Sequence, residues 1–234
     1  MTIAVIPARG GSKRIPHKNT RSFSGKPVIA YSIAACQEAK VFQQILVSTD
    51  DPEIAEIAMA LGADVPFLRP ASVSDDHSGT DDVMAQVLDQ LAATGVQHKF
   101  ACCVYATAPF IRSNDLLAGW REIQSAEIDY VFSASTYAHP IYRAFTEMGT
   151  GGLTMVNPQR YHTRSQDLPV AWHDAAQFYW GKTDAWLERR PMFDFKSRIV
   201  AVPRWRVQDI DTYEDWHHAE LMWRVQQDKH DAVK

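Results

Sequence analysis

Four cationic side chains lie within ten residues near the start of the chain: Arg9, Lys13, Arg14 and Lys18. They follow a short apolar run at residues 3–6 and lie on both sides of the glycine pair Gly10 and Gly11. Glycine allows the backbone to approach a ligand closely, and arginine and lysine are strong partners of phosphate oxygens. We therefore predict a loop at the end of a strand that binds a polyphosphate.

The loop carries neither of the common glycine motifs for phosphate. The P-loop spacing GxxxxGK[ST] is absent, and so is the dinucleotide motif GxGxxG. Side chains must then supply much of the positive charge. Arg9 can bind two phosphate oxygens at once, while Lys13 and Lys18 act as point charges. We expect Arg14 to be merely solvated.

A pair of carboxylates near the end of the chain, Asp209 and Asp211, is the second chemical signal. At the end of a strand, residues i and i+2 point to the same face, so both carboxylates could reach one cation. Carboxylate oxygens together with phosphates suit Mg²⁺. In the alternative reading, Asp211 or Thr212 simply caps the last helix, and these residues alone leave both readings open.

Other polar residues follow predicted strands. Arg69 lies on a loop, where arginines are usually solvated, and Asp75 and Asp76 lie further along the same loop. Residues 105–109 (YATAP) end a strand with small polar side chains that could contact a base or sugar. Gln177, near His173 and Asp174, could bind a polar ligand. No GxSxG or HExxH motif is present, which favours direct transfer over a covalent enzyme intermediate.

Strand-like and helix-like segments alternate along the chain. Apolar runs of strand length occupy residues 44–49, 100–104, 130–134, 175–180 and 199–202. Helical periodicity marks residues 27–36, 51–62, 80–95, 113–123 and the segment after 211. Single helices between strands predict an α/β fold with a Rossmann-like, mostly parallel sheet and helices on both faces. Ligands of such sheets bind beyond the carboxyl ends of the strands, where the cationic loop lies.

Residues 137–169 break this alternation. Glycines, prolines and polar residues interrupt the segment, and it has no helical period. Long structureless loops are uncommon in compact domains. We predict an inserted arm or hairpin that packs on a partner subunit, within a single domain that spans residues 1–234.

Composition excludes several classes of protein. The 234 residues include 24 Lys and Arg against 28 Asp and Glu, which gives no support to a duplex nucleic-acid binder. The early apolar run is too short for a signal peptide or a membrane span. The three cysteines lack metal-ligand spacing and are expected to be small buried hydrophobes in a reducing compartment. We expect a cytoplasmic protein with no nucleic-acid or membrane partner.

The cationic loop, residues 6–19 (IPARGGSKRIPHKN), resembles the signature loop of the CMP-sugar-acid synthetases. These are cytidylyltransferases that activate nine-carbon acidic sugars. Further segments resemble the family in the same order along the chain: GKPVIAYSI, VSTDD, FLRPASVSDD, YATAPFIR, TRSQDLP, DAAQFYWG and DIDT. The resemblance therefore spans nearly the whole chain.

Two segments look most like the family members that act on pseudaminic acid, namely YATAP and the pair RSQDLP and QFYWG. The sialic acid members usually carry a glutamine, in a QPTSP-type segment, where this chain has Tyr105. They also carry a lysine near the position of Tyr142. Both differences fall where the sugar is expected, so the resemblance favours pseudaminic acid. N-acetylneuraminate, legionaminate and a ketodeoxyoctonate remain alternatives.

The resemblance implies a fold of the nucleotide-diphospho-sugar transferase type that binds CTP and Mg²⁺ and forms a homodimer through the 137–169 arm. It implies nucleotide contacts at Ala8, Arg9, Gly10, Gly11, Ser12, Lys13, Lys18, Asn19, Arg69 and Thr80. It implies sugar contacts at Tyr105, Thr107, Arg143, Arg164 and Gln177, with Arg143 able to serve the partner's site. It implies catalytic roles for Arg9, Lys18, Asp209 and Asp211, of which the two aspartates are the metal ligands.

Two remoter alternatives are a regulatory nucleotide-binding module and a nicotinamide oxidoreductase. The paired carboxylates Asp209 and Asp211 argue against a module without turnover. An oxidoreductase would use Asp50 as its ribose-binding acid, but the missing glycine motif counts against it.

Overall fold

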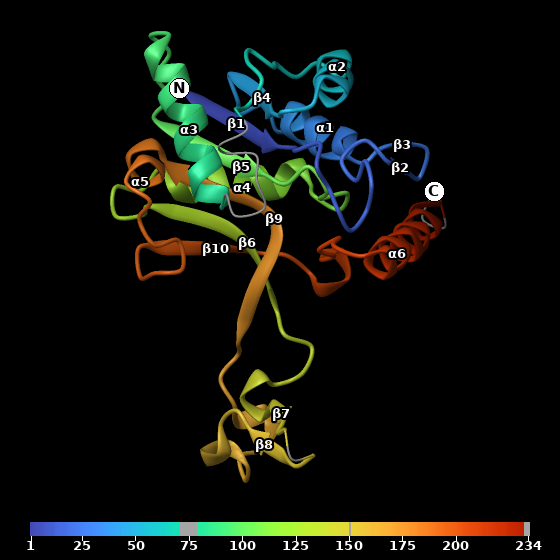
Figure 1. Ribbon diagram of the computed structural model, residues 1–234. Helices are drawn as coiled ribbons and strands as arrows, with labels where there is room; N and C mark the ends of the chain where they lie inside the picture. Colours follow the sequence, from blue (N-terminus) through green and yellow to red (C-terminus); the bar gives the residue numbers. More distant parts are fainter. Residues whose placement is uncertain (71–78, 150, 232–234) are drawn as a thin grey trace.

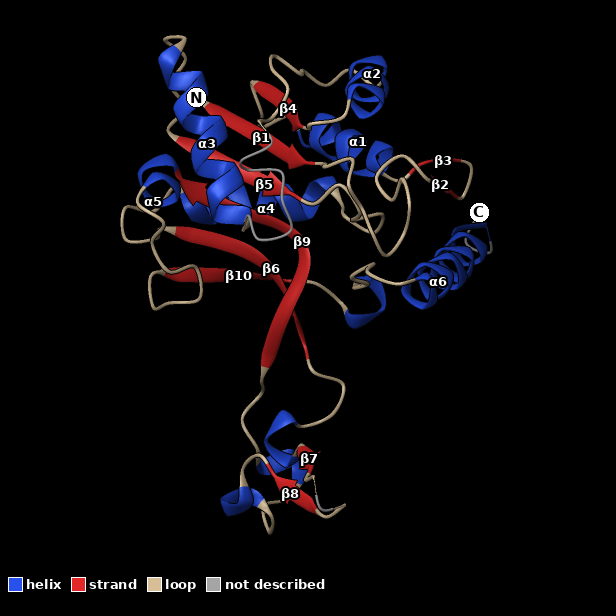
Figure 2. Ribbon diagram, in the orientation of Figure 1, coloured by secondary structure: helices blue, strands red, loops and turns tan. Residues whose placement is uncertain are grey.

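A six-stranded sheet forms the centre of the computed structural model, with strand order β10-β6-β9-β5-β1-β4 (Figures 1 and 2). Its strands are β1 (Thr2–Pro7), β4 (Gln44–Ser48), β5 (Phe100–Val104), β6 (Tyr130–Thr136), β9 (Trp172–Lys182) and β10 (Ser197–Ala201). β9 runs antiparallel to its neighbours β5 and β6, and the other neighbouring pairs are parallel. The prediction of a mostly parallel sheet is therefore confirmed.

The structure describes residues 1–70, 79–149 and 151–231. Asp75 and Asp76, and with them most of the matched segment FLRPASVSDD, lie outside the described residues. No helix in the described ranges is both long and apolar enough to cross a membrane.

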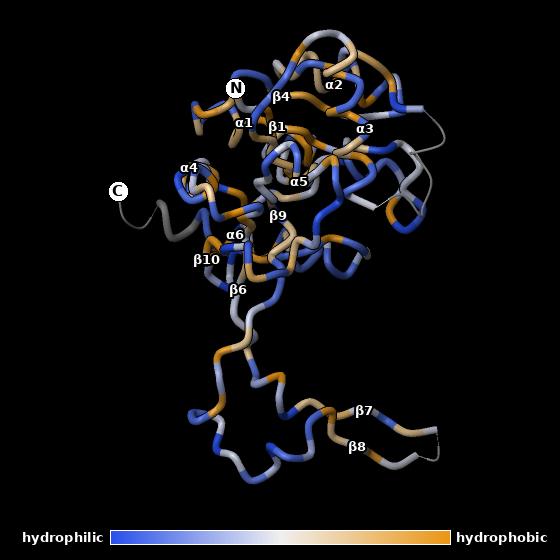
Figure 3. Tube along the Cα trace, turned by 90° about the vertical axis from the view of Figure 1, so that its left-hand side faces the viewer, coloured by the Kyte–Doolittle hydropathy of each residue, from blue (hydrophilic) through white to orange (hydrophobic). Residues whose placement is uncertain are grey.

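Helices cover both faces of the sheet. They are α1 (Ile29–Ala39), α2 (Pro52–Ala60), α3 (Thr80–Ala93), α4 (Ser113–Ile123) and α5 (Thr183–Leu187). The last helix, α6 (Tyr213–Asp231), packs beside the sheet against Phe23. Side chains alternate between the two faces of a strand. Along β1, Ala4 and Ile6 pack in the cluster formed with α1, α2 and α4, while Ile3 and Val5 pack in the cluster formed with α3 and α5. Figure 3 shows β1 and β4 as apolar segments inside these layers.

Local signals set the ends of several helices where they were predicted. The Asp51 carboxylate accepts hydrogen bonds from the backbone N–H of Glu53 at 2.8 Å and of Ile54 at 3.4 Å. Pro52 occupies the first helical position of α2. This combination satisfies N–H groups that have no partner within the helix, so α2 begins at the start of the predicted helical segment 51–62.

A third apolar cluster joins the two ends of the chain. It contains Ile15 from the cationic loop, Phe23, Ile210 and Trp216 at the start of α6. Ile15 and Ile210 are both fully buried. Their burial removes apolar surface from water and thereby holds the cationic loop against the segment that carries the paired aspartates.

The segment between β6 and β9 projects from the body as an arm (Figures 1 and 3). It contains a short antiparallel hairpin and three single turns of 3₁₀ helix: β7 (Phe145–Glu147), β8 (Leu153–Met155), η2 (Ile141–Arg143), η3 (Pro158–Arg160) and η4 (Ser165–Asp167). Large apolar side chains on it are exposed, among them Phe145 at 63% and Leu153 at 67%. The predicted hairpin is therefore present.

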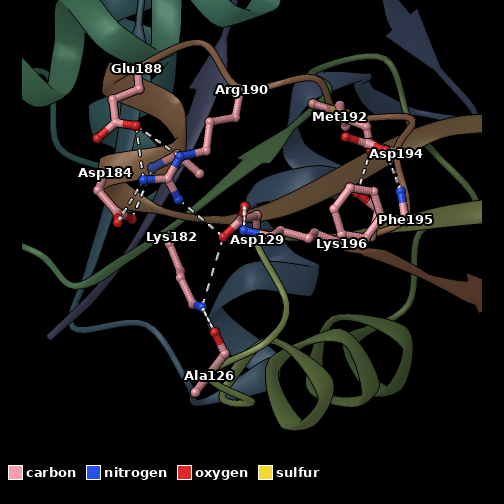
Figure 4. Close-up of polar contacts among 12 residues, drawn as sticks. Ala126, Asp129, Lys182, Asp184, Glu188, Arg190, Met192, Asp194, Phe195 and Lys196 are labelled. Carbon is pink, nitrogen blue, oxygen red and sulfur yellow. Dashed lines mark hydrogen bonds and ion pairs between the residues drawn. The ribbon is translucent and has the colours of Figure 1, made fainter.

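A charged network ties together the amino end of β6 and the end of β9 (Figure 4). The buried Asp129 carboxylate lies 3.1 Å from Arg190 and 3.9 Å from Lys182. Arg190 also contacts Asp184 at 3.2 Å and Glu188 at 2.9 Å. Because it lies at the amino end of β6, this network is on the edge of the sheet opposite to the carboxyl ends of the parallel strands.

We predict that Gly181→Ala destabilises the protein. A Cβ atom at Gly181, on β9, would lie 2.3 Å from Nε1 of Trp186 and 2.8 Å from Cε1 of Tyr130. Overpacking of this kind in a buried region costs about 1–3 kcal/mol, which urea unfolding would measure. Gly149→Ala is the matched control, because no atom lies within 4 Å of a Cβ placed there. Equal unfolding midpoints for the two variants would contradict the prediction.

Candidate active site

A cavity of about 480 Å³ opens at the carboxyl ends of β1 and β5. Its lining combines the cationic loop, the residues around Arg69 and Thr80, the end of β5 and Asp211. The predicted site residues that it brings together are Arg9, Ser12, Lys13, Lys18, Asn19, Arg69, Thr80, Tyr105, Thr107 and Asp211. The cavity is strongly cationic and therefore suits a polyphosphate.

Short polar contacts hold the backbone of the cationic loop. Gly10 donates its N–H to the Asp50 carboxylate at 2.9 Å, and the Asn19 amide donates to the Arg9 carbonyl at 2.9 Å. Ala8 is buried and donates its N–H to the Ser48 carbonyl. Asp50 thus supports the loop, which leaves no reason to read it as the ribose-binding acid of an oxidoreductase.

Lys18 connects the two ends of the chain. Its ammonium group donates to the Ile210 carbonyl at 2.7 Å and lies 3.4 Å from the Asp211 carboxylate. Arg14 approaches the same carboxylate oxygen at 2.8 Å, although its side chain is 64% exposed. The sequence reasoning expected Arg14 to be merely solvated, and its contact with Asp211 was missed. The sequence held one indication of this contact, namely that Arg14 belongs to the cationic loop.

The alternative reading, in which Asp211 or Thr212 caps the last helix, holds for Thr212 and not for the Asp211 side chain. The Thr212 hydroxyl accepts the N–H of Asp215 at 3.2 Å, and the Asp215 carboxylate accepts the N–H of Thr212 at 2.8 Å. This reciprocal pair caps α6 without the Asp211 side chain. The carboxylate of Asp211 is instead directed at Lys18 and Arg14.

One sequence expectation about the aspartate pair is wrong. Asp209 and Asp211 do not lie at the end of a strand, because β10 ends at Ala201 and residues 207–212 form neither helix nor strand. Successive side chains at residues 209–211 nevertheless alternate in direction, since Ile210 between the two aspartates is fully buried. Burial of Ile210 leaves the two flanking carboxylates on the accessible side of the segment.

The aspartate pair fits a hard divalent cation. Partial burial raises the pKa of the Asp209 carboxyl, and the negative charge of Asp211 raises it further, against an opposing effect of Lys18. A cation between the carboxylates would relieve this repulsion. Within the described ranges, no group of three or more His, Cys, Asp or Glu side chains is placed to hold a metal. Mg²⁺ needs no such group, because it usually combines one or two carboxylates with phosphates and water.

A second cavity, of about 280 Å³, adjoins the first through Thr80 and Tyr105, which line both. Its other lining residues are Asp81, Asp174, Tyr179, Met192 and Phe193. The Tyr105 hydroxyl lies 3.1 Å from the Thr80 hydroxyl. Burial raises the pKa of Tyr105. Its hydroxyl therefore stays protonated, and this cavity offers hydrogen bonds and aromatic surface where the first offers positive charge.

An irregularity in β9 sets the direction of Asp174. The pairing of β6 with β9 shifts register between Phe132 and Ala134, and Ala176 has a positive φ of 51°. One Asp174 oxygen accepts the N–H of Ala176 at 2.8 Å, and the other accepts the Tyr179 hydroxyl at 2.5 Å. Bulges redirect side chains in this way. Sequence reasoning did not identify Tyr179 or Phe193, because neither stands out from the apolar pattern around it.

Three predicted sugar contacts lie elsewhere. Gln177 is buried and donates its amide to the Arg206 carbonyl at 2.6 Å. Arg143 and Arg164 lie on the arm, where Arg164 pairs with Asp167 at 2.8 Å. None of the three lines either cavity as the described residues form it. Ala8, Gly10 and Gly11 also stay outside the described lining, although each adjoins a residue that belongs to it, and Asp209 stays outside it two positions before Asp211.

Comparison with known families agrees with this arrangement. Residues 3–229 match the family model described as cytidylyltransferase. The chain belongs to the cytidylyltransferase family. It is 39% identical to a pseudaminic acid cytidylyltransferase of Campylobacter jejuni, over 95% of this chain and 96% of that protein. It is 31% identical to the N-acylneuraminate cytidylyltransferase A of Danio rerio, over 93% of this chain and 49% of that protein.

Solved structures share the fold of this cytidylyltransferase. A CMP:2-keto-3-deoxy-manno-octonic acid synthetase complexed with CTP superposes with a TM-score of 0.71 at 17% identity, covering 96% of this chain and 99% of that one. A 4-diphosphocytidyl-2C-methyl-D-erythritol synthase from Anaerococcus prevotii gives a TM-score of 0.67 at 12% identity, covering 95% and 96% of the two chains. The Rossmann-like nucleotidyltransferase fold implied by the resemblance is thereby confirmed.

We predict that Gly10→Ala impairs the cationic loop. A Cβ atom there would lie 2.4 Å from Oδ2 and 2.8 Å from Cβ of Asp51. Because the loop would have to shift, we expect turnover to fall about 10²-fold, the typical effect of a displacement of about 1 Å in a site. Steady-state kinetics with CTP would measure the loss.

The control for this prediction is the double variant Gly10→Ala, Asp51→Gly. It removes the obstructing side chain, and glycine is tolerated at a helix cap with a loss of only a few tenths of a kcal/mol. Partial recovery of turnover is expected. If the double variant were no more active than Gly10→Ala alone, the steric explanation would be refuted.

Proposed function

We propose that this cytidylyltransferase couples CTP to pseudaminic acid and releases pyrophosphate. The observation that carries the proposal is the cationic cavity in which Lys18 faces Asp211, beside a second cavity that is acidic and aromatic. The 39% identity to a pseudaminic acid cytidylyltransferase over nearly the whole chain supports this acceptor. N-acetylneuraminate, legionaminate and a ketodeoxyoctonate are the alternative acceptors.

The cationic loop would bind the triphosphate. In the proposed reaction, the anomeric hydroxyl of the sugar acid attacks the α-phosphorus of CTP in line. An oxygen–phosphorus bond forms, the bond between the α-phosphorus and the oxygen that bridges to the β-phosphate breaks, pyrophosphate leaves, and the proton of the attacking hydroxyl passes to solvent. Such a reaction depends on positioning and on neutralising the developing charge. Lys18 would neutralise charge at the transferred phosphorus, while Arg9 and Lys13 would hold the leaving group.

Asp209 and Asp211 would hold Mg²⁺ at the edge of the first cavity. When bound there, the ion would polarise the α-phosphate and lower the pKa of the attacking hydroxyl. Asp211 already contacts Lys18 and Arg14, so these cations compensate its charge in the free protein.

The second cavity is the proposed site of the acceptor sugar. Asp174 and Asp81 can accept hydrogen bonds from its hydroxyl or amide groups, and Tyr105 lies at the boundary with the phosphate site. The same two acids would repel the sugar's own carboxylate. That carboxylate therefore needs a cation from elsewhere, and the arm residues Arg143 and Arg164 remain the proposed source.

The arm formed by residues 137–169 is the proposed contact with a second copy of the chain, within a single domain that spans residues 1–234. It extends away from the body and exposes Phe145, Leu153 and Val156, each by more than 60%. Exposed apolar side chains gathered on one segment are typical of an interaction surface. A dimer would also allow Arg143 to serve the partner's site.

An assay of pyrophosphate release across the candidate sugar acids tests the acceptor. With CTP and Mg²⁺, we expect the highest kcat/KM with pseudaminic acid, because Tyr105 and Tyr142 stand where the sialic acid members usually carry a glutamine and a lysine. Higher efficiency with N-acetylneuraminate or legionaminate would replace the proposed acceptor. Pyrophosphate release with none of the acids would contradict the proposed reaction.

Charge variants control this assay. We expect Arg9→Ala to lower turnover about 10²–10³-fold, as loss of one preorganised charge does in comparable sites. Arg121→Ala, which removes an exposed arginine near the end of α4, is the matched control and should retain turnover.

We predict that the wild-type protein has twice the chain mass of 26.4 kDa in solution. The double variant Phe145→Glu, Leu153→Glu should be monomeric, because it places charges on the exposed apolar face of the hairpin. Light scattering after gel filtration would measure both masses. Val96→Glu, at an exposed apolar position after α3, is the control and should stay dimeric. A monomeric wild-type protein would rule out the proposed dimer.

A further inference from the structure

A buried polar cluster lies just before the aspartate pair in the chain. Arg206 forms a two-pronged ion pair with Asp115 of α4, at 2.5 Å and 3.3 Å, and only 6% of the Arg206 side chain is exposed. Gln177 of β9 donates its amide to the Arg206 carbonyl at 2.6 Å. One residue is therefore held through both its side chain and its main chain.

The energetics of this cluster favour a single geometry. A buried guanidinium is costly unless it is paired, and a forked pair with a carboxylate restricts both distance and orientation. The neighbouring arginine strengthens this restriction. Arg112 and Arg206 lie 5.5 Å and 5.9 Å from the Trp205 ring. Burial lowers the pKa of Arg112, the positive charge of Arg206 lowers it further, and the negative charge of Asp115 opposes both effects. The negative charge of Asp115 thus stabilises a site that holds two arginines.

The cluster matters because residues 207–212 have no regular backbone structure of their own. The segment is held on one side by Arg206. On the other side it is held by Ile210, whose side chain is buried and whose carbonyl accepts a hydrogen bond from the Lys18 ammonium group at 2.7 Å. Asp209 lies between these two anchors. Its position relative to Asp211 therefore depends on both.

We propose that Asp115, Arg206 and Gln177 are positioning residues for the Asp209–Asp211 pair, and so determine how tightly a divalent cation binds with the nucleotide. The inference rests on the proposed function, since it assigns these residues to the cation site of that reaction. It also gives Gln177 a role that its buried position allows: Gln177 acts through the Arg206 carbonyl.

The test is Asp115→Asn, which keeps the shape of the side chain and removes its charge. We expect Mn²⁺ binding to the CTP complex, measured by electron paramagnetic resonance, to weaken about tenfold, within the range known for residues that orient metal ligands. The Mg²⁺ concentration for half-maximal turnover should rise by the same factor, while the KM for CTP at saturating metal stays close to that of the wild type.

Asp129→Asn is the matched control, because it also breaks a buried ion pair, at the opposite end of the sheet (Figure 4). It should lower the unfolding midpoint and leave Mn²⁺ binding unchanged. Gln177→Met provides a second variant if Asp115→Asn does not fold. It removes the hydrogen bond to the Arg206 carbonyl and should also weaken Mn²⁺ binding.

The outcomes separate the two proposals. If the wild-type protein with CTP binds no Mn²⁺, the proposed function fails and the inference fails with it. If the wild type binds Mn²⁺ but the Asp115 or Gln177 variant binds it equally well, only the positioning role is overturned. Equal weakening of Mn²⁺ binding in Asp129→Asn would also overturn the positioning role. The weaker binding would then follow from lower stability of the fold and not from the position of the aspartate pair.

Discussion

The contact between Lys18 and the segment of Ile210 and Asp211 is the interaction on which the site depends. It joins residues 192 positions apart in the chain and places a carboxylate among side chains that would otherwise repel one another. Burial of Ile15 and Ile210 in one apolar cluster supplies the cohesion that this polar contact needs. The cationic loop is therefore a site only when the last part of the fold has closed on it.

The two adjoining cavities differ in charge, and this difference suits them to different ligands. Positive side chains line the first, which suits the phosphates of a nucleotide, and acids and aromatic rings line the second. Tyr105 and Thr80 belong to both, so the transferred group would cross from one to the other at these residues. The acids Asp81 and Asp174 would disfavour an anionic group in the second cavity, so the carboxylate of the proposed sugar acid would need a cation from outside it.

Buried ion pairs occur at both ends of the sheet and differ in what they hold in place. The Asp129 network joins strands and loops at the amino end of β6, opposite to the carboxyl ends of β1 and β5 where the first cavity opens. The pair of Asp115 and Arg206 lies a few residues before Asp209, where a change in its geometry would be transmitted along an irregular segment. A buried ion pair adds little net stability, because removing its charges from water offsets much of their attraction, but it does restrict the relative positions of the two side chains.

Local patterns in the chain were enough to predict most of the sheet, the principal helices and the cationic loop. Residues 100–104 and 113–123 form the predicted strand and helix because apolar periodicity and capping act over a few residues. The directions of individual side chains were not predictable in this way. The inward turn of Gln177, the contact of Arg14 with Asp211 and the second cavity around Tyr179 each depend on residues distant in sequence. They arise from the bulge in β9 and from closure of the two chain ends, and a local pattern carries no information about either.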